Sequence, residues 1–144
     1  MEETYISTSD QETKGIAAKI ASSLKSGTVI CLWGDLAAGK TTFTQGLAME
    51  LGIKRLTSPT FIIMREYPIS NNTSIKTLFH LDLYRLDTPD DIKSFDLEEI
   101  MFDPSNLVII EWPEKLGDCL PKKRIDVKFK ITDDNEREIT INNI

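Results

Sequence analysis

The amino-acid sequence predicts one α/β domain: a three-layer fold with a mixed, mostly parallel β-sheet, helices on both of its faces and a C-terminal antiparallel hairpin. Apolar strand-like runs alternate with amphipathic helical segments up to about residue 112, a pattern typical of such folds. From residue 125 onward, apolar residues alternate with charged ones instead. The 144 residues, 40% of them hydrophobic, suffice for one ordinary core but not for two. We therefore expect residues 1–144 to form a single domain.

The first predicted helix covers residues 10–25. Ser9 and Glu12 have the spacing of a capping box at its start, and Gly27 is expected to end it. Apolar side chains four positions apart would give this helix one apolar face, formed by Ile16, Ile20 and Leu24.

The next two elements are a strand at residues 28–33 and a helix at residues 40–51. The strand sequence, TVICLW, is apolar without alternation, which indicates burial on both faces of a sheet. The helix carries an apolar stripe and is expected to end at Gly52. The same criteria predict the later elements: strands at 60–67, 77–84 and 106–112, short helices at 89–95 and from Asp96, and hairpin strands at 125–131 and 137–142.

Residues 34–42, GDLAAGKTT, match the pattern G-x-x-x-x-G-K-[ST] and lie between the first buried strand and the following helix. Backbone N–H groups in such a loop, together with the positive end of a helix dipole, bind polyphosphates. Lys40 would reach the outer phosphates, and the Thr41 hydroxyl would bind Mg²⁺. The alternative is a strand-to-helix turn with an incidental Gly-Lys-Thr. The predicted phosphate loop consists of Gly34, Asp35, Leu36, Ala37, Ala38, Gly39, Lys40, Thr41 and Thr42.

Two acidic residues end later strands, where ligands collect in parallel sheets. Asp82 lies in HLDLYRL and Glu111 in LVIIEW, which resembles a Walker B strand although Ile110 stands where many such strands carry Asp. Glu111 is expected to bind Mg²⁺ directly or through water, or to orient the attacking water, with Asp82 sharing these duties. The alternative for Asp82 is a surface carboxylate paired with Arg85.

A third part of the site is predicted in TSPTF, residues 57–61. A hydroxyl between the loop helix and the next strand can sense the γ-phosphate, and Thr60 and Ser58 are the candidates. A Ser-Pro turn that enters a strand explains the segment equally well. No arginine finger is evident, and Arg65 and Arg85 are the candidates for that role.

Composition excludes several other classes. The formal net charge of −6, from 17 basic and 23 acidic side chains, provides no global attraction to nucleic acid. Two cysteines without metal-ligand spacing and a single histidine offer little for a zinc site or a catalytic triad. No apolar run approaches the roughly eighteen residues of a membrane span, and the N-terminal residues do not resemble a signal peptide. We therefore expect a cytoplasmic protein.

Four motifs together resemble one bacterial family. They are GDL-A-AGKTTF, then SPTF, then H-x-D-x-YRL, formed by His80, Asp82, Tyr84, Arg85 and Leu86, and finally EWPE at 111–114. In order and approximate spacing the chain resembles TsaE, formerly YjeE, the ATPase of tRNA threonylcarbamoyladenosine synthesis. The resemblance covers nearly the whole chain.

The resemblance implies more than the residues alone. It implies ATP and Mg²⁺ as cofactors, slow hydrolysis by the isolated protein, and TsaD and TsaB as partners, with tRNA touched only indirectly. The lack of a long apolar run separately predicts no membrane association. The resemblance further implies that Thr41 and Glu111 bind Mg²⁺, and that Asp82 and Thr60 belong to the nucleotide-sensing site. Ala37 replaces a glycine usual in the family's loop, which would cost on the order of 1 kcal/mol if its φ is positive.

Two other functions use the same motif. One is a small-molecule kinase, although the extended polar loop ISNNTSIKT lacks the arginines of a typical lid. The other is a nucleotide-gated binding module with little catalysis, in which Glu111 and Asp82 serve structure alone. A GTPase is disfavoured because N-K-x-D and D-x-x-G segments are absent.

Overall fold

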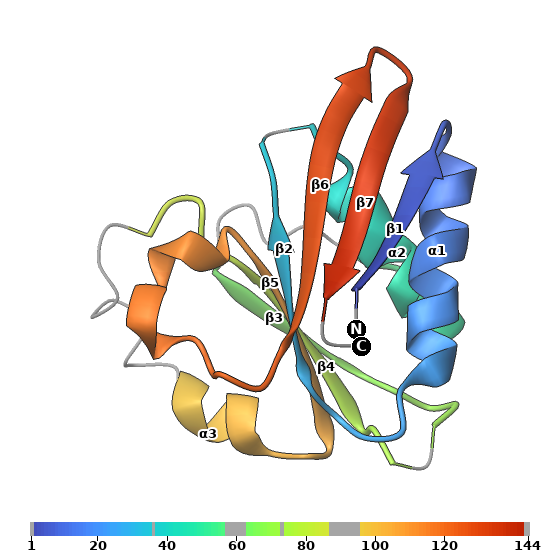
Figure 1. Cartoon of the computed structure of the whole chain (residues 1–144). Helices are drawn as coiled ribbons and strands as arrows, with labels where there is room; N and C mark the ends of the chain where they lie inside the picture. The colour runs from blue at the N-terminus through green and yellow to red at the C-terminus, as the bar shows by residue number, and fades with distance from the viewer. Residues whose placement is uncertain (1, 36, 57–62, 73, 87–95, 143–144) are drawn as a thin grey trace.

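The computed structural model describes residues 2–35, 37–56, 63–72, 74–86 and 96–142. Figure 1 shows these residues as a twisted sheet with helices packed against it. The predictions for Leu36, Ser58, Thr60, residues 60–62 and the helix at 89–95 lie outside the described residues.

Within the described residues the sheet has seven strands, in the order β1-β7-β6-β2-β5-β4-β3. Strands β6, β2, β5 and β4 run parallel to their neighbours in this group, whereas β1, β7 and β3 pair antiparallel with theirs. The strands are β1 (Glu2–Ser7), β2 (Val29–Trp33), β3 (Met64–Pro68), β4 (Thr77–Asp82), β5 (Asn106–Glu111), β6 (Ile125–Asp133) and β7 (Glu136–Asn142).

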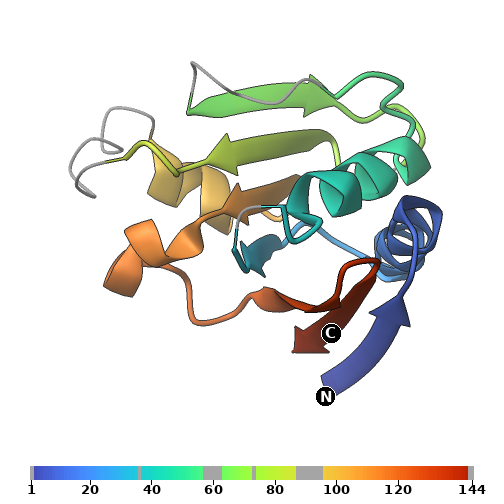
Figure 2. The same ribbon diagram turned by 90° about the horizontal axis from the view of Figure 1, so that it is seen from above.

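Helices cover both faces of the sheet. Helices α1 (Asp10–Ser23) and α2 (Lys40–Glu50) lie on one face, and α3 (Leu97–Phe102) lies on the other, as Figure 2 shows from above. Strand β5 contributes to both resulting cores, because Leu107 and Ile109 join one cluster while Val108 and Ile110 join the other. Covered faces on both sides explain the continuous apolar strand sequences. The predicted three-layer α/β fold is confirmed.

The first helix forms as predicted at its start and ends earlier than predicted. The Glu12 N–H donates to Ser9 Oγ at 3.1 Å, which caps α1. The helix ends at Ser23 with Leu24 as its C-cap, so the prediction that Gly27 ends it was wrong. Gly27 is needed for a close approach instead, because a Cβ there would lie 2.0 Å from the Asn106 carbonyl oxygen.

Several strand boundaries differ from prediction. Strand β4 ends at Asp82 and β5 at Glu111, each short of the predicted end. After β5 the chain turns sharply at Trp112, whose φ is 62°, into the 3-10 turns η2 (Pro113–Lys115) and η3 (Gly117–Cys119), which were not predicted. The second helix, by contrast, ends at Glu50, and Gly52 follows with a φ of 83° as expected.

Strand β1 was not predicted from the sequence. This strand lies at the edge of the sheet and pairs only with β7. Ser7 is its one buried residue, whereas Ile6 is 52% exposed. Because an edge strand with one covered face has little apolar signal, its sequence did not stand out from a polar N-terminal segment. Among the described helices, none combines the length and apolarity that crossing a membrane requires.

Candidate nucleotide-binding site

The phosphate loop, residues 34–42, joins the central strand β2 to α2. Gly34 has a φ of 150° and Gly39 a φ of 103°, a region that glycine adopts without steric cost. At Gly34 a Cβ would also lie 2.9 Å from the Phe129 carbonyl oxygen. These two glycines therefore allow the tight path between strand and helix.

The N-terminus of α2 is left open toward this loop. Its N-cap is Gly39, which has no side chain to accept a hydrogen bond from the first turn, and the first turn contains no acidic residue. The first N–H groups of a helix have no partner within the helix, and the helix dipole adds positive potential there. An anion is the natural partner of such an end.

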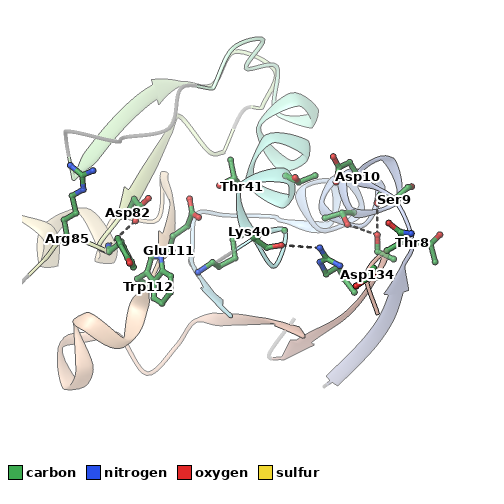
Figure 3. A pocket seen from close by; sticks show the side chains of 18 of the residues that line it. Thr8, Ser9, Asp10, Lys40, Thr41, Asp82, Arg85, Glu111, Trp112 and Asp134 are labelled. Atoms are coloured by element: carbon green, nitrogen blue, oxygen red, sulfur yellow. Dashed lines mark hydrogen bonds between the residues drawn. The ribbon is translucent and has the colours of Figure 1, made fainter. Parts of the chain in front are cut away.

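Lys40 places a buried ammonium group beside this helix end. The residue is 5% exposed, and its Nζ donates to the Gly34 carbonyl at 2.7 Å and lies 3.6 Å from the centre of the Trp112 ring. Burial lowers the pKa of Lys40, an effect opposed chiefly by the negative charge of Glu111. Figure 3 shows the side chain directed toward Glu111 and Trp112.

The two predicted carboxylates lie side by side at the ends of neighbouring strands. Asp82 is the register partner of Glu111 across β4 and β5. Glu111 is 4% exposed, whereas Asp82 is half-buried and accepts a hydrogen bond from the Tyr84 N–H at 3.1 Å. Burial raises the pKa of Asp82, and the nearby charge of Glu111 raises it further. The parallel pairing thus brings both acids to the phosphate loop.

A cleft of about 770 Å³ contains these groups. Its volume lies within the usual range for small-molecule sites. Lys40, Thr41, Asp82 and Glu111 line it together and lie near one another in Figure 3. Ala37, Gly39, Thr42 and Arg85 also line the cleft. The structure therefore assembles most of the predicted site residues, while their roles stay predictions.

The opposite wall of the cleft was missed by the sequence analysis. It is formed by the start of α1 and by the turn between β6 and β7, with lining residues Ser7, Thr8, Ser9, Asp10, Thr13, Asp134, Asn135 and Arg137. Ser7 and Thr13 share a buried hydroxyl–hydroxyl hydrogen bond of 2.7 Å. No local motif marks these residues as part of a binding site, because the pairing of β1 with β7 brings them to the loop.

Among the loop residues that the structure describes, Ala37 has strained backbone geometry. Its φ is 63°, in the left-handed region that disfavours residues with a Cβ. Its carbonyl accepts a hydrogen bond from the Arg137 side chain on β7 at 3.3 Å. Ala37, which replaces the glycine usual in the family's loop, therefore has the positive φ at which an alanine is strained.

His80 is a further polar residue of the site. It is fully buried on β4, and its Nε2 lies 2.6 Å from Glu111 Oε2. The sequence analysis used it only as part of a motif. A lone histidine in an apolar strand, two residues before Asp82 and therefore on the same face, was the available signal.

The donor set fits magnesium. Mg²⁺ prefers oxygen ligands and is usually held by one or two carboxylates together with substrate phosphates and water. Thr41, Asp82 and Glu111 offer one hydroxyl and two carboxylates along the cleft. No group of three or more His, Cys, Asp or Glu side chains capable of holding a metal occurs in the described part of the chain. One hydroxyl and two carboxylates are a donor set to which the oxygens of a bound phosphate could add further ligands.

Comparison with known proteins identifies the family. The sequence model described as "Threonylcarbamoyl adenosine biosynthesis protein TsaE" matches residues 7–139. The chain belongs to the TsaE family. It is 42% identical over 131 residues to the tRNA threonylcarbamoyladenosine biosynthesis protein TsaE of Bacillus subtilis, covering 90% of this chain and 78% of that one. The Treponema pallidum protein of the same name is 35% identical over 137 residues, covering 94% of this chain and 97% of that one.

A solved structure agrees with this assignment. The crystal structure of Bacillus subtilis YdiB superposes with a TM-score of 0.79 at 35% sequence identity, covering 98% of this chain and 84% of that chain. The TsaE-family fold therefore extends over nearly the whole chain, including the antiparallel strands that form the second wall of the cleft.

Proposed function

We propose that this TsaE-family protein is a Mg²⁺-dependent P-loop ATPase that acts in the cytoplasm in tRNA threonylcarbamoyladenosine biosynthesis, on a complex of TsaD and TsaB. One observation carries the ATPase proposal. A buried ammonium group, Lys40, lies beside an uncapped helix N-terminus and faces two carboxylates at the ends of parallel strands. This combination binds a triphosphate and its metal.

The phosphates would lie against the first turn of α2. Lys40 and the backbone N–H groups would neutralise charge on the outer phosphates, the main catalytic requirement of phosphoryl transfer. Thr41 and Glu111 would hold Mg²⁺, which supplies further charge stabilisation when bound. Asp82 would orient the attacking water, because its burial raises its pKa and makes it a better proton acceptor than an exposed aspartate. The hydroxyl-rich opposite wall is left for sugar and base.

The partner proposal rests on the family. Members carry the name of tRNA threonylcarbamoyladenosine biosynthesis proteins, and the resemblance implies TsaD and TsaB as the proteins on which ATP hydrolysis acts. Since no arginine of the chain is assigned to the transition state, we expect slow turnover alone. The partner complex would complete or stimulate the site.

The test measures phosphate release from Mg-ATP by the wild type and by Lys40→Ala, each with and without the purified TsaB–TsaD pair. We expect Lys40→Ala to lose hydrolysis by at least about 100-fold, since it removes a preorganised charge from the transition state. Lys130→Ala, an exposed charge on β6, is the control and should behave as wild type.

Full turnover by Lys40→Ala would refute the site. Wild-type rates unchanged by the TsaB–TsaD pair would count against the proposed partners. Transfer of phosphate to an added small molecule, rather than release of free phosphate, would indicate the kinase alternative.

A further inference from the structure

His80 is an isolated polar side chain in an apolar layer. It is the single histidine of the chain, and its side chain is 0% exposed. Leu78 on the same strand and Ile109, its register partner on β5, belong to the core cluster on this face of the sheet. A buried polar group costs free energy unless it is hydrogen-bonded. The contact with Glu111, at 2.6 Å, is the one that compensates His80 within the described residues.

The position of its proton follows from the surroundings. His80 Nδ1 is buried and has no hydrogen-bond partner among the described residues. A proton on Nδ1 would leave a buried N–H unsatisfied and would set the Nε2 lone pair against the Glu111 carboxylate. The proton is therefore on Nε2, which donates to Glu111 Oε2.

The hydrogen bond from His80 holds the Glu111 carboxylate in the same cleft as the Lys40 ammonium group, although the two do not form an ion pair. Lys40 and Glu111 line the same cleft and attract one another. Even so, among the described side chains no ion pair joins Lys40 to a carboxylate. Lys40 donates to the Gly34 carbonyl and lies over Trp112, while Glu111 accepts from His80. Both charges are thus held by other groups.

We propose that His80 is a positioning residue for Glu111. By engaging Oε2 it keeps the carboxylate from turning onto the Lys40 ammonium and leaves the other oxygen for Mg²⁺ or a water bound to it. This inference rests on the proposed function. Partners that hydrogen-bond a metal-binding carboxylate orient it, and their loss typically weakens metal binding about 10–100-fold.

The test compares three variants. His80→Leu removes the donor, whereas His80→Gln keeps an amide N–H at a similar reach. Leu78→Ala removes buried volume on the same strand, away from the cleft, and serves as a control for lost stability. For each, the affinity of a fluorescent ATP analogue is measured with Mg²⁺ and with EDTA. The ratio of the two affinities reports how strongly metal and nucleotide assist one another.

We expect His80→Leu to lose at least about tenfold of the Mg²⁺-dependent gain in affinity. His80→Gln should retain most of the gain, and Leu78→Ala should retain all of it. If His80→Leu does not fold, His80→Asn, whose shorter amide does not reach Glu111, replaces it with the same expectation. A full gain in His80→Leu, or an equal loss in Leu78→Ala, would overturn the positioning role alone. A wild type without any gain would overturn the proposed magnesium site itself.

A second readout needs no nucleotide. Because the chain contains one histidine, the imidazole nitrogen signals in an NMR spectrum of tag-free protein are unambiguous. We expect the neutral form protonated on Nε2, and Glu111→Ala should remove this preference. Protonation on Nδ1 in the wild type would contradict the inferred hydrogen bond.

Discussion

The two halves of the sheet differ in what they bury. The central strands β2, β5 and β4 are covered on both faces and are mainly apolar, yet His80 is buried within β4 and Glu111 at the carboxyl end of β5. The outer ribbon is formed by β6, β7 and β1; β6 and β7 alternate inward apolar residues with outward polar ones, whereas β1 buries only Ser7. The ribbon buries Val127, Ile139 and Ile141.

This difference suggests that the central strands serve mainly the proposed activity and the outer ribbon mainly the stability of the fold. Burying charged groups and a histidine costs free energy, so the residues of the candidate site make the central half less stable than an apolar core would be. The ribbon stabilises the fold and supplies the second wall of the cleft. Substitutions in the centre should therefore change activity more than stability, and substitutions in the ribbon the reverse.

The largest effect is expected at the centre. Glu111→Gln keeps an oxygen that accepts from His80 but removes the negative charge, so ATP hydrolysis should fall about 10²–10³-fold. Steady-state kinetics measure this. Glu138→Gln, a matched change on β7 of the ribbon, should leave the rate unchanged. Comparable losses of ATP hydrolysis in Glu111→Gln and Glu138→Gln would contradict the assignment of activity to the central half alone.

The ribbon should show the largest effect on stability. Ile139 is fully buried on β7 between Phe129 and Tyr5 in register, and Ile139→Ala should lower the free energy of unfolding by about 3 kcal/mol. Denaturant titration gives this value. The folded variant should bind ATP as tightly as the wild type. A small loss of stability, or a large loss of affinity, would show that the ribbon does more than support the fold.

Ala37→Gly tests the place where the two halves meet, since the Ala37 carbonyl of the loop accepts a hydrogen bond from Arg137 on β7. The substitution relieves the positive φ at Ala37 and should raise stability by up to about 1 kcal/mol, while ATP affinity is preserved or increased. Thermal unfolding and calorimetric titration measure the two quantities. Ala18→Gly in α1 should have the opposite sign, since it removes a good helix former. A clear loss of ATP affinity in Ala37→Gly would mean that the strained loop is the binding-competent form.

Asp82→Asn should have the smallest effect on stability among these variants. Because burial raises the pKa of Asp82 above its ordinary value of 3.8, its ionisation at neutral pH costs the folded state free energy that asparagine avoids. The metal-free variant should melt higher than the wild type at pH 7, by no more than about 2–4 °C given the partial exposure. The difference should shrink as the pH falls through the pKa of Asp82 and vanish below 3.8. A lower melting temperature at pH 7 would show that the charge stabilises the fold.

Much of the central half was predictable because its signals are local. The predicted phosphate loop combines fixed spacing with a strand before it and a helix after it, and the segments 77–84 and 106–112, which contain Asp82 and Glu111, were predicted as strands. The errors fell where neighbours decide the outcome. Gly27 does not end a helix; it is needed because a Cβ there would clash with the Asn106 carbonyl. Strand β1 forms by pairing with β7, which is distant in the sequence.

The sequence by itself determined the layered α/β class, and it predicted the phosphate loop with Lys40 and Thr41 and the two acids Asp82 and Glu111, because periodicity and motif spacing are properties of contiguous residues. Only the tertiary structure decided that Asp82 and Glu111 pair in register, that His80 takes one oxygen of Glu111, and that the N-terminal segment and the β6–β7 turn complete the cleft. Contacts between distant segments depend on strand order and register, which no local pattern encodes.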